Sequence, residues 1–457
     1  MSYHYTDACE MGFAPDASGE ANAMALQEAV DRGGTVIVSR PGTYDIARTV
    51  YLGSDTALTF GRGVKLRKTA ELGPFTYVLR NKGAVSRTWD ERITVSGLHL
   101  EVNGVDAREN DICGLIGHVS FFYVRDLRIE GFRCLDLMPH QFALQICTFE
   151  DLLVDDVIIH GQKDGVHLGR GKRFAIRNGV FRTVDDAIAL NAHDYTTSNP
   201  EVGWLEDGVV ENCRDLDQPK RLGFFCRLLA GAWTDWRDGM AVQRSDSVVS
   251  GGRLYRVGGV PDGTVYRSTT RPTHETGVCE LDGIEWVMAQ DDPLTSAGVR
   301  DVVFRDIMLE KPRTGFSVHF DCDRYSRSYY PGADRPVQEQ ILLDNVHVQH
   351  DEAVPLVWVG TPVDAICIRN SRLADSGVHF HNPSDLEDFG RTAVSFVGCV
   401  FRKAGAMPLL VNDVEGRQID LATASSVVLH EDFRAEVAAG GGAVAVNSDL
   451  PGLVRSP

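Results

Sequence analysis

The chain has no long hydrophobic run. None of its 457 residues lies in a stretch that approaches the roughly 18 consecutive apolar residues of a membrane-spanning helix. The N-terminal residues MSYHYTDACEMGF carry neither the basic segment nor the apolar segment of a signal peptide. No Asn-x-Ser/Thr sequence with x other than proline occurs, which excludes N-linked glycosylation. We therefore expect a cytoplasmic protein with no membrane partner.

Paired cysteines and excess positive charge are also missing. None of the ten cysteines forms a CxxC pair, which excludes the common zinc and thiol-redox motifs. Several lie in apolar runs, where cysteine behaves as a small hydrophobic residue. The 64 acidic residues outnumber the 46 basic ones, giving a net charge of −18. This balance excludes nucleic acid and anionic membrane surfaces as partners.

Helical periodicity beyond the N-terminus and regular two-residue hairpin turns are absent, which excludes a propeller or a sandwich. A short unit repeats instead from about residue 90: an apolar strand, an Asp or Asn, and a second apolar pair. The aligned positions Asp126, Asp156, Asn178 and Asp207 differ by 30, 22 and 29 residues. A period near 22 with insertions predicts an all-β chain folded as a right-handed, single-stranded parallel β-helix. The Asp or Asn at each turn is expected to adopt a left-handed backbone.

The first part of the chain contains one predicted helix. Ser18 or Asn22 caps its start, and Gly33-Gly34 ends it. A solenoid needs a cover over its first coil, and this helix is suited to be that cover. We expect one continuous solenoid domain, with an N-terminal cap and first coils over 1–90, the main β-helix over 91–430, and a C-terminal tail or cap over 431–457.

Three aspartates fall one coil apart in the stretch 154–195. Asp185 and Asp186 follow Asp164 by 21 and 22 residues, so their carboxylates should share one patch of surface. Crowded carboxylates raise one another's pKa and destabilise a fold. Glycoside hydrolysis, which needs an acid and a base, and calcium binding both use such clusters. The alternative is that these aspartates only cap turns. Because adjacent residues of a regular strand point to opposite faces, both Asp185 and Asp186 reach one cleft only if the backbone is bent there.

Long insertions interrupt the repeat at 192–208, 215–239, 261–293 and 320–336, and we expect them to form loops over one face. They are rich in Trp, Tyr and Arg. The alternative to a role in binding is that these rings pack the loops against the solenoid. Our candidates for stacking on sugar rings are Trp204, Trp233, Trp236, Tyr325, Tyr329 and Tyr330.

The central stretch resembles glycoside hydrolase family 28, the polygalacturonases. Gln162-Lys163-Asp164-Gly165 stands where that family has NTDG, and Val184-Asp185-Asp186 stands where it has GDD. The opening pattern over 15–44 is also similar to that of pectate-lyase-like β-helix proteins. The resemblance implies a metal-free, inverting reaction without a cofactor. It implies that Asp185 is the general acid and that Asp164 and Asp186 hold and deprotonate the attacking water.

The chain departs from the family's pattern after the two aspartates. It has no GHG motif, and His193 is the best substitute for that histidine. It has no RIK motif, and Arg227 or Arg244 stands in a comparable context. His167 replaces the second acidic residue of the family's NTDGID. We expect these four residues to bind substrate.

We therefore predict a glycoside hydrolase, inverting and exo-acting, with an oligosaccharide or polysaccharide as its substrate. Two alternatives stay open. A calcium-dependent polysaccharide lyase or epimerase would use the aspartates as metal ligands, with Arg170, Lys172 or Arg227 as the base. A carbohydrate-binding β-helix without catalytic activity would use the same groove only to hold sugar.

Overall fold

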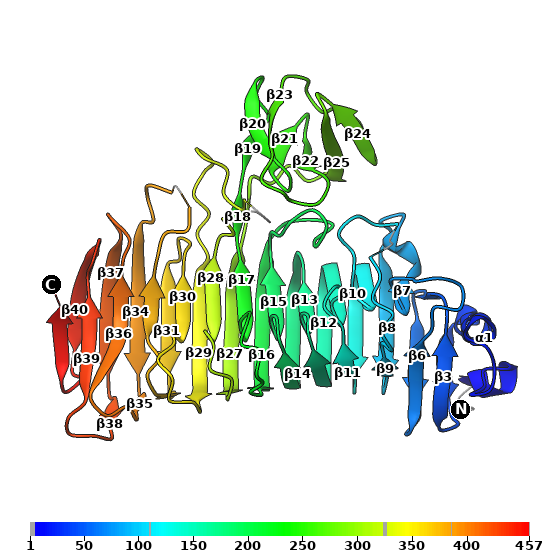
Figure 1. Ribbon diagram of the computed structural model, residues 1–457, viewed down its shortest axis with the longest axis horizontal. Helices are drawn as coiled ribbons and strands as arrows, with labels where there is room; N and C mark the ends of the chain where they lie inside the picture. Colours follow the sequence, from blue (N-terminus) through cyan, green and yellow to red (C-terminus); the bar gives the residue numbers. More distant parts are fainter. Residues whose placement is uncertain (1–4, 109–110, 323–326, 385, 457) are drawn as a thin grey trace.

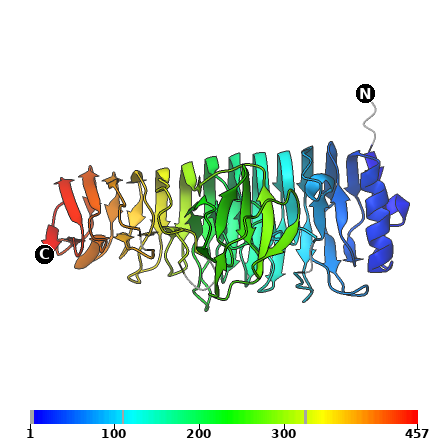
Figure 2. The same cartoon turned by 90° about the horizontal axis from the view of Figure 1, so that it is seen from above.

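A computed structural model describes residues 5–108, 111–322, 327–384 and 386–456. The chain is a parallel β-helix, as the repeat predicts, whose coils stack along one long axis (Figures 1 and 2). Over the residues that the structure describes, its main sheet has 32 strands. Within the described residues, no helix is both long and apolar enough to cross a membrane.

The helix α1 (Gly19–Asp31) covers the N-terminal end of the solenoid. The side chain of Ser18 accepts a hydrogen bond from the backbone N–H of Ala21 at 3.2 Å, so Ser18 is the cap. Leu26, Ala29 and Val30 are buried against the first coils. α1 packs on β3 (Gly42–Ile46) and β4 (Val50–Leu52), which confirms the predicted cover.

The central coils are built from one short and one long strand each. The short strands that form the face bearing the aspartates are β13 (Val166–Leu168), β15 (Ile188–Asn191), β17 (Cys226–Leu229) and β28 (Phe316–His319). The long strands are β10 (Val119–Glu130), β12 (Leu144–Gly161), β14 (Gly171–Thr183), β16 (Leu205–Asp215) and β27 (Val299–Leu309). Their inward residues form apolar stacks, such as Val154, Ile176, Val210 and Phe304, all fully buried. These stacks are the physical origin of the sequence period.

The Asp and Asn of the repeat lie at bends in the long strands, and their backbone is left-handed, with φ between 47° and 56° for the four aligned positions. The alignment itself was wrong, because the long strand bends twice. Asp126 and Asp207 lie at the first bend, in line with Asp151 and Arg173, whereas Asp156 and Asn178 lie at the second. The intervals of 30, 22 and 29 residues are therefore unequal for two reasons. They compare positions at two different bends, and they include insertions.

The insertions within 215–293 form more than loops. Between β17 and β27 the chain builds a subdomain that stands out from the solenoid (Figure 1). It contains a five-stranded sheet and a two-stranded antiparallel sheet. The larger sheet consists of β19 (Thr234–Asp235), β21 (Ser247–Ser250), β22 (Arg253–Val257), β25 (Ile284–Gln290) and β24 (Val278–Leu281), and the smaller one of β20 (Met240–Gln243) and β23 (Val265–Ser268). Buried Val242, Tyr255 and Trp286 give it a core of its own.

Coil pairing continues to both ends of the described chain. β1 (Tyr5–Asp7) already pairs in parallel with β2 (Gly34–Val38). At the other end, β39 (Arg434–Ala438) pairs with β41 (Leu453–Ser456). The last strands therefore add coils to the same solenoid.

Candidate active site

The three aspartates come together from two neighbouring coils. Gly165 donates a backbone hydrogen bond to the carbonyl of Asp186 at 3.0 Å, so Asp164 and Asp186 lie one above the other, just before β13 and β15. One carboxylate oxygen of each of Asp164, Asp185 and Asp186 lies within 4.8 Å of those of the other two. Asp164 and Asp186 are each 2% exposed, whereas the side chain of Asp185 is 34% exposed. Asp185 is therefore the member of the triad that solvent reaches.

The bend expected between Asp185 and Asp186 is present. Both residues lie in the turn between β14 and β15, where strand alternation does not apply, and neither points into the lumen. The carbonyl of Asp185 accepts a hydrogen bond from Arg313 Nη1 at 2.7 Å. Asp186 Oδ1 accepts one from the backbone N–H of Phe224 at 2.8 Å. These bonds fix the turn so that both carboxylates face one place.

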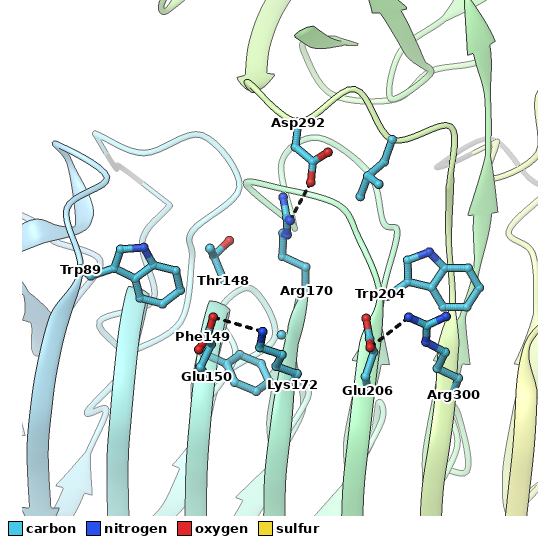
Figure 3. A pocket seen from close by; sticks show the side chains of 12 residues that line it. Trp89, Thr148, Phe149, Glu150, Arg170, Lys172, Trp204, Glu206, Asp292 and Arg300 are labelled. Atoms are coloured by element: carbon cyan, nitrogen blue, oxygen red, sulfur yellow. Dashed lines mark hydrogen bonds and ion pairs between the residues drawn. The ribbon is translucent and has the colours of Figure 1, made fainter. Parts of the chain in front are cut away.

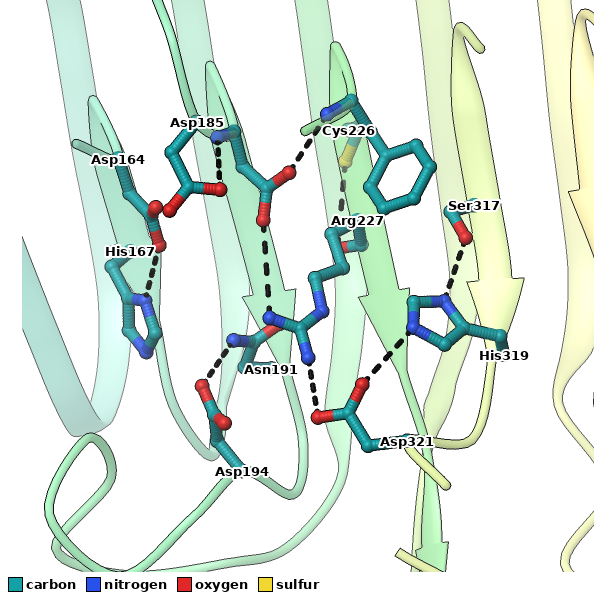
Figure 4. Close-up of polar contacts among 12 residues, drawn as sticks. Asp164, His167, Asp185, Asn191, Asp194, Cys226, Arg227, Ser317, His319 and Asp321 are labelled. Atoms are coloured by element: carbon teal, nitrogen blue, oxygen red, sulfur yellow. Dashed lines mark hydrogen bonds and ion pairs between the residues drawn. The ribbon is translucent and has the colours of Figure 1, made fainter. Parts of the chain in front are cut away.

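Lys163 is a member of this cluster that the sequence interpretation missed. Its ammonium group forms an ion pair with Asp185 and lies 3.5 Å from Asp164 Oδ1 (Figure 4 shows the two aspartates). Burial alone would lower the pKa of Lys163, but the two carboxylates hold it above the usual value. One fixed positive charge therefore offsets part of the crowding among the three aspartates.

The pKa values of the two buried carboxyls are shifted in opposite directions. Burial, with Asp185 and Asp164 beside it, raises the pKa of Asp186 well above the usual value. Burial would also raise the pKa of Asp164, but Lys163 and a hydrogen bond with His167 bring it below the usual value. The environment therefore favours a proton on Asp186 and the ionised form of Asp164. Environments that push two pKa values apart are typical of an acid and a base.

His167 lies beneath the triad and not in the path of a substrate. Its Nδ1 is 3.0 Å from Asp164 Oδ2 (Figure 4), and its ring stacks on Phe142 with centroids 4.0 Å apart. It is fully buried. The predicted substrate contact is therefore corrected to an orienting contact with Asp164.

Arg227, in contrast, lies beside the triad. Its Nη1 is 4.0 Å from Asp186 Oδ2, and its Nη2 forms an ion pair with Asp321. His319 joins the same network, with Nε2 3.2 Å from Asp321 Oδ1 and Nδ1 2.6 Å from Ser317 Oγ (Figure 4). Ser317, His319 and Asp321 had not been singled out. Their spacing of two places them on one face of a strand and its extension, which is the signal that could have found them.

Two other predicted substrate contacts lie inside the protein. Trp233 is 2% exposed and packs where the subdomain meets the solenoid. His193 packs against Trp233, with ring centroids 5.6 Å apart, and its Nε2 lies 3.5 Å from Ser247 Oγ. Burial, with the charge of Arg256 nearby, lowers the pKa of His193 to about 3. Both residues are corrected from substrate binding to packing of the subdomain.

The last two predicted contacts are Arg244 and Tyr325. Arg244 forms an ion pair with Asp262 on the subdomain and donates to the carbonyl of Val260. In this structure Arg244 therefore holds a turn of the subdomain, and its contact with substrate stays a prediction. Tyr325 lies outside the described residues, so stacking by its ring stays a prediction.

The ion pairs of Lys163 suggest a test of its role. In Lys163→Met the pKa of Asp164 should rise, because the cation that lowers it is gone. If Asp164 is the base, the acidic limb of the kcat/KM profile should move to higher pH. Lys65→Met is the matched control, since Lys65 is an exposed lysine paired with Glu101 at 2.8 Å, far along the solenoid. An acidic limb that stays in place would contradict the role given to Lys163.

No protein-family model matches the chain, and no curated protein sequence matches it. Solved structures share its fold at low sequence identity. The N-terminal fragment of bacteriophage phi29 gene product 12 is 11% identical, with a TM-score of 0.54 over 98% of this chain and 72% of that one. A hyperthermoactive exopolygalacturonase from Thermotoga maritima is 11% identical, with a TM-score of 0.50 over 94% of this chain and 92% of that one. A family 28 exopolygalacturonase from Yersinia enterocolitica is 11% identical, with a TM-score of 0.48 over 99% and 79%. At these identities the likeness is one of fold.

Proposed function

We propose that the protein is a glycoside hydrolase whose catalytic residues are Asp164, Asp185 and Asp186. The observation that carries this proposal is the cluster of carboxyls from adjacent coils, with one oxygen of each within 4.8 Å of the others, in which the pKa of Asp164 is lowered and that of Asp186 is raised. Glycoside hydrolysis needs one ionised and one protonated carboxyl on either side of the bond. The shared fold with an exopolygalacturonase is consistent with it.

The electrostatics assign the proton donor to Asp186, where the resemblance implied Asp185. Asp185 forms an ion pair with the Lys163 ammonium, whereas burial and the neighbouring carboxylates raise the pKa of Asp186. Asp186 lacks so close a cation, since Arg227 is 4.0 Å away. In this proposal Asp186 protonates the leaving oxygen, Asp164 deprotonates the attacking water, and Asp185 binds the sugar at the exposed side of the cluster.

The stereochemical outcome follows from whether water fits between acid and base. Inverting enzymes usually hold the two carboxyls about 6.5–9.5 Å apart, and retaining enzymes about 5–5.5 Å. The nearest oxygens here lie within 4.8 Å, which is short for inversion. We keep inversion as the proposal, because Asp164 is 2% exposed and its two oxygens face Lys163 and His167, so it is poorly placed to form a bond to carbon itself. The first anomer formed, seen by NMR, decides between the two outcomes.

Exo action is part of the proposal because of the subdomain. It is inserted after β17, the strand that carries Arg227, and stands out from the solenoid (Figure 1). A subdomain that blocks one end of a substrate-binding groove favours removal of sugar units from the end of the substrate chain. The substrate is then an oligosaccharide or the end of a polysaccharide, and the net charge of −18 argues against nucleic acid.

The calcium-dependent lyase is the second candidate, because three carboxylates could bind a hard cation. One observation counts against it: the Lys163 ammonium already bonds to Asp185 and lies near Asp164, where a cation would bind. We therefore expect activity to persist in excess chelator and the product to show no ultraviolet absorbance from an unsaturated sugar. Loss of activity in chelator, restored by calcium, would instead identify a lyase.

The experiment that tests the hydrolase proposal is a screen of plant and microbial oligosaccharides with detection of new reducing ends. We expect turnover of at least one oligosaccharide by the wild-type protein and none above background by Asp164→Asn. Sugar binding without turnover in the wild-type protein would favour the carbohydrate-binding β-helix without catalytic activity.

A further inference from the structure

A cavity of about 480 Å³ lies on the long-strand side of the solenoid, away from the three aspartates. Trp89 stands at one end of it and Trp204 at the other (Figure 3). Glu150, Arg170 and Lys172 line the space between them. Its volume lies within the range of small-molecule binding sites.

The β-helix sets the distance between the two indoles. The residues that follow them, Asp90 and Leu205, belong to one line across the sheet, through Val124, Phe149 and Gly171. Trp89 and Trp204 are therefore four rungs apart. At about 4.8 Å per rung, their backbones are separated by roughly 19 Å. A ligand that touches both rings is therefore an extended chain.

Both indoles are held in place and are only partly buried. The Arg125 guanidinium lies 4.1 Å from the ring centroid of Trp89, and the Tyr123 ring packs edge-on against the same indole at 5.3 Å. The Arg300 guanidinium lies 4.9 Å from the ring centroid of Trp204. Fixed aromatic surface that is left half-exposed beside a cavity marks a binding site.

The charges that line the cavity cancel in pairs. Lys172 Nζ lies 3.4 Å from Glu150 Oε1, Arg170 Nη2 lies 3.0 Å from Asp292 Oδ2, and Arg300 Nη2 lies 3.0 Å from Glu206 Oε2. Three acidic and three basic groups leave no net field to attract a polyanion. They do offer many hydrogen-bond donors and acceptors at fixed positions.

We propose that this cleft is a second carbohydrate-binding site that takes a neutral oligosaccharide. The apolar faces of two sugar rings stack on Trp89 and Trp204, and hydroxyl groups between them bond to the paired charges. The site is distinct from the triad. Asp164 and Asp186 come just before β13 and β15, whereas the cleft lies at the starts of the long strands. The proposal does not depend on the triad being catalytic.

The test is calorimetric titration of the full chain carrying Asp164→Asn, so that nothing is consumed. The probes are cello-, xylo-, manno- and malto-hexaose, with a galacturonate hexamer as the charged comparison. We expect one neutral hexamer to bind, with Trp89→Ala and Trp204→Ala each weakening binding about tenfold or more. Trp204→Phe keeps an aromatic ring and should weaken binding of the hexamer less than Trp204→Ala does. Tyr51→Ala is the matched control, because Tyr51 is a 37% exposed ring stacked under Arg80 outside the cleft.

A second variant avoids any loss of folding in the tryptophan substitutions. Asp292→Trp on the subdomain loop should fill the cleft and abolish binding while leaving the solenoid intact. The proposal is overturned if no neutral hexamer binds, if binding survives both the Trp→Ala pair and Asp292→Trp, or if the galacturonate hexamer binds more tightly. If the wild-type protein shows no hydrolase activity but a neutral hexamer still binds in the cleft, the proposal for the cleft is supported. Only the proposed catalytic role of the triad is then contradicted.

Discussion

Asp186→Asn should lower kcat on a natural oligosaccharide by about 10²–10⁴-fold and recover much of that loss on an aryl glycoside with a good leaving group. The reason is that a good leaving group needs no proton, and Asp186 is the carboxyl whose pKa is raised by burial and by the neighbouring carboxylates. Asp164→Asn should lose as much and recover nothing, because every substrate still needs an activated water.

The stability of these variants distinguishes a catalytic role of the aspartates from a purely structural one. A carboxyl whose pKa is raised in the folded state costs folding free energy once the pH exceeds its unfolded pKa of about 3.9. Asp186→Asn should therefore leave Tm at neutral pH unchanged or raise it. Recovery on the aryl glycoside by Asp185→Asn, and not by Asp186→Asn, would return the acid's role to Asp185. A large loss of Tm in all three variants would mean that the aspartates only shape the turns.

Arg313→Met should reduce the free energy of unfolding by about 3–5 kcal/mol. Arg313 forms two hydrogen bonds with Asp215, Nε to Oδ2 at 2.9 Å and Nη2 to Oδ1 at 2.8 Å, and both side chains are at most 2% exposed. Removing the arginine leaves a buried carboxylate without its partner. Urea unfolding followed by circular dichroism measures the change.

Arg305→Met is the matched control, because Arg305 pairs with Glu211 at the surface, where an ion pair contributes about 0–1 kcal/mol. The double variant Arg313→Met, Asp215→Leu should regain most of the stability, since no buried charge is left unpaired. It should stay inactive. Arg313 also donates to the carbonyls of Asp185 and Leu222, and this holds the turn that bears the triad. Equal losses in Arg313→Met and Arg305→Met would contradict this account.

The repeat predicted the solenoid because its inward residues stack in register, as Val154, Ile176 and Val210 do. The same period brought Asp164 over Asp186. It did not separate the two bends of the long strand, because Asp126 and Asp156 both adopt the left-handed backbone and carry the same residue type. Residue identity alone does not show which turn a residue occupies.

The subdomain was the main feature that the sequence did not predict. Its strands are short and most of them pair antiparallel, with connections of varied length, so no sequence period marks them. For this reason the burial of His193 and Trp233, which the subdomain covers, could not be predicted from the sequence. Lys163 was overlooked because it stands at a turn, and its importance appears only when Asp185 of the next coil folds over it.

The most direct test of the central claim is hydrolysis of an active oligosaccharide in water enriched in oxygen-18, in excess chelator, with mass spectrometry of the products. If the triad directs water to the anomeric carbon, one heavy oxygen appears at each new reducing end of the wild-type products, and Asp164→Asn forms none above background. Products that are unsaturated and carry no heavy oxygen, or label incorporated equally well by Asp164→Asn, would contradict the account.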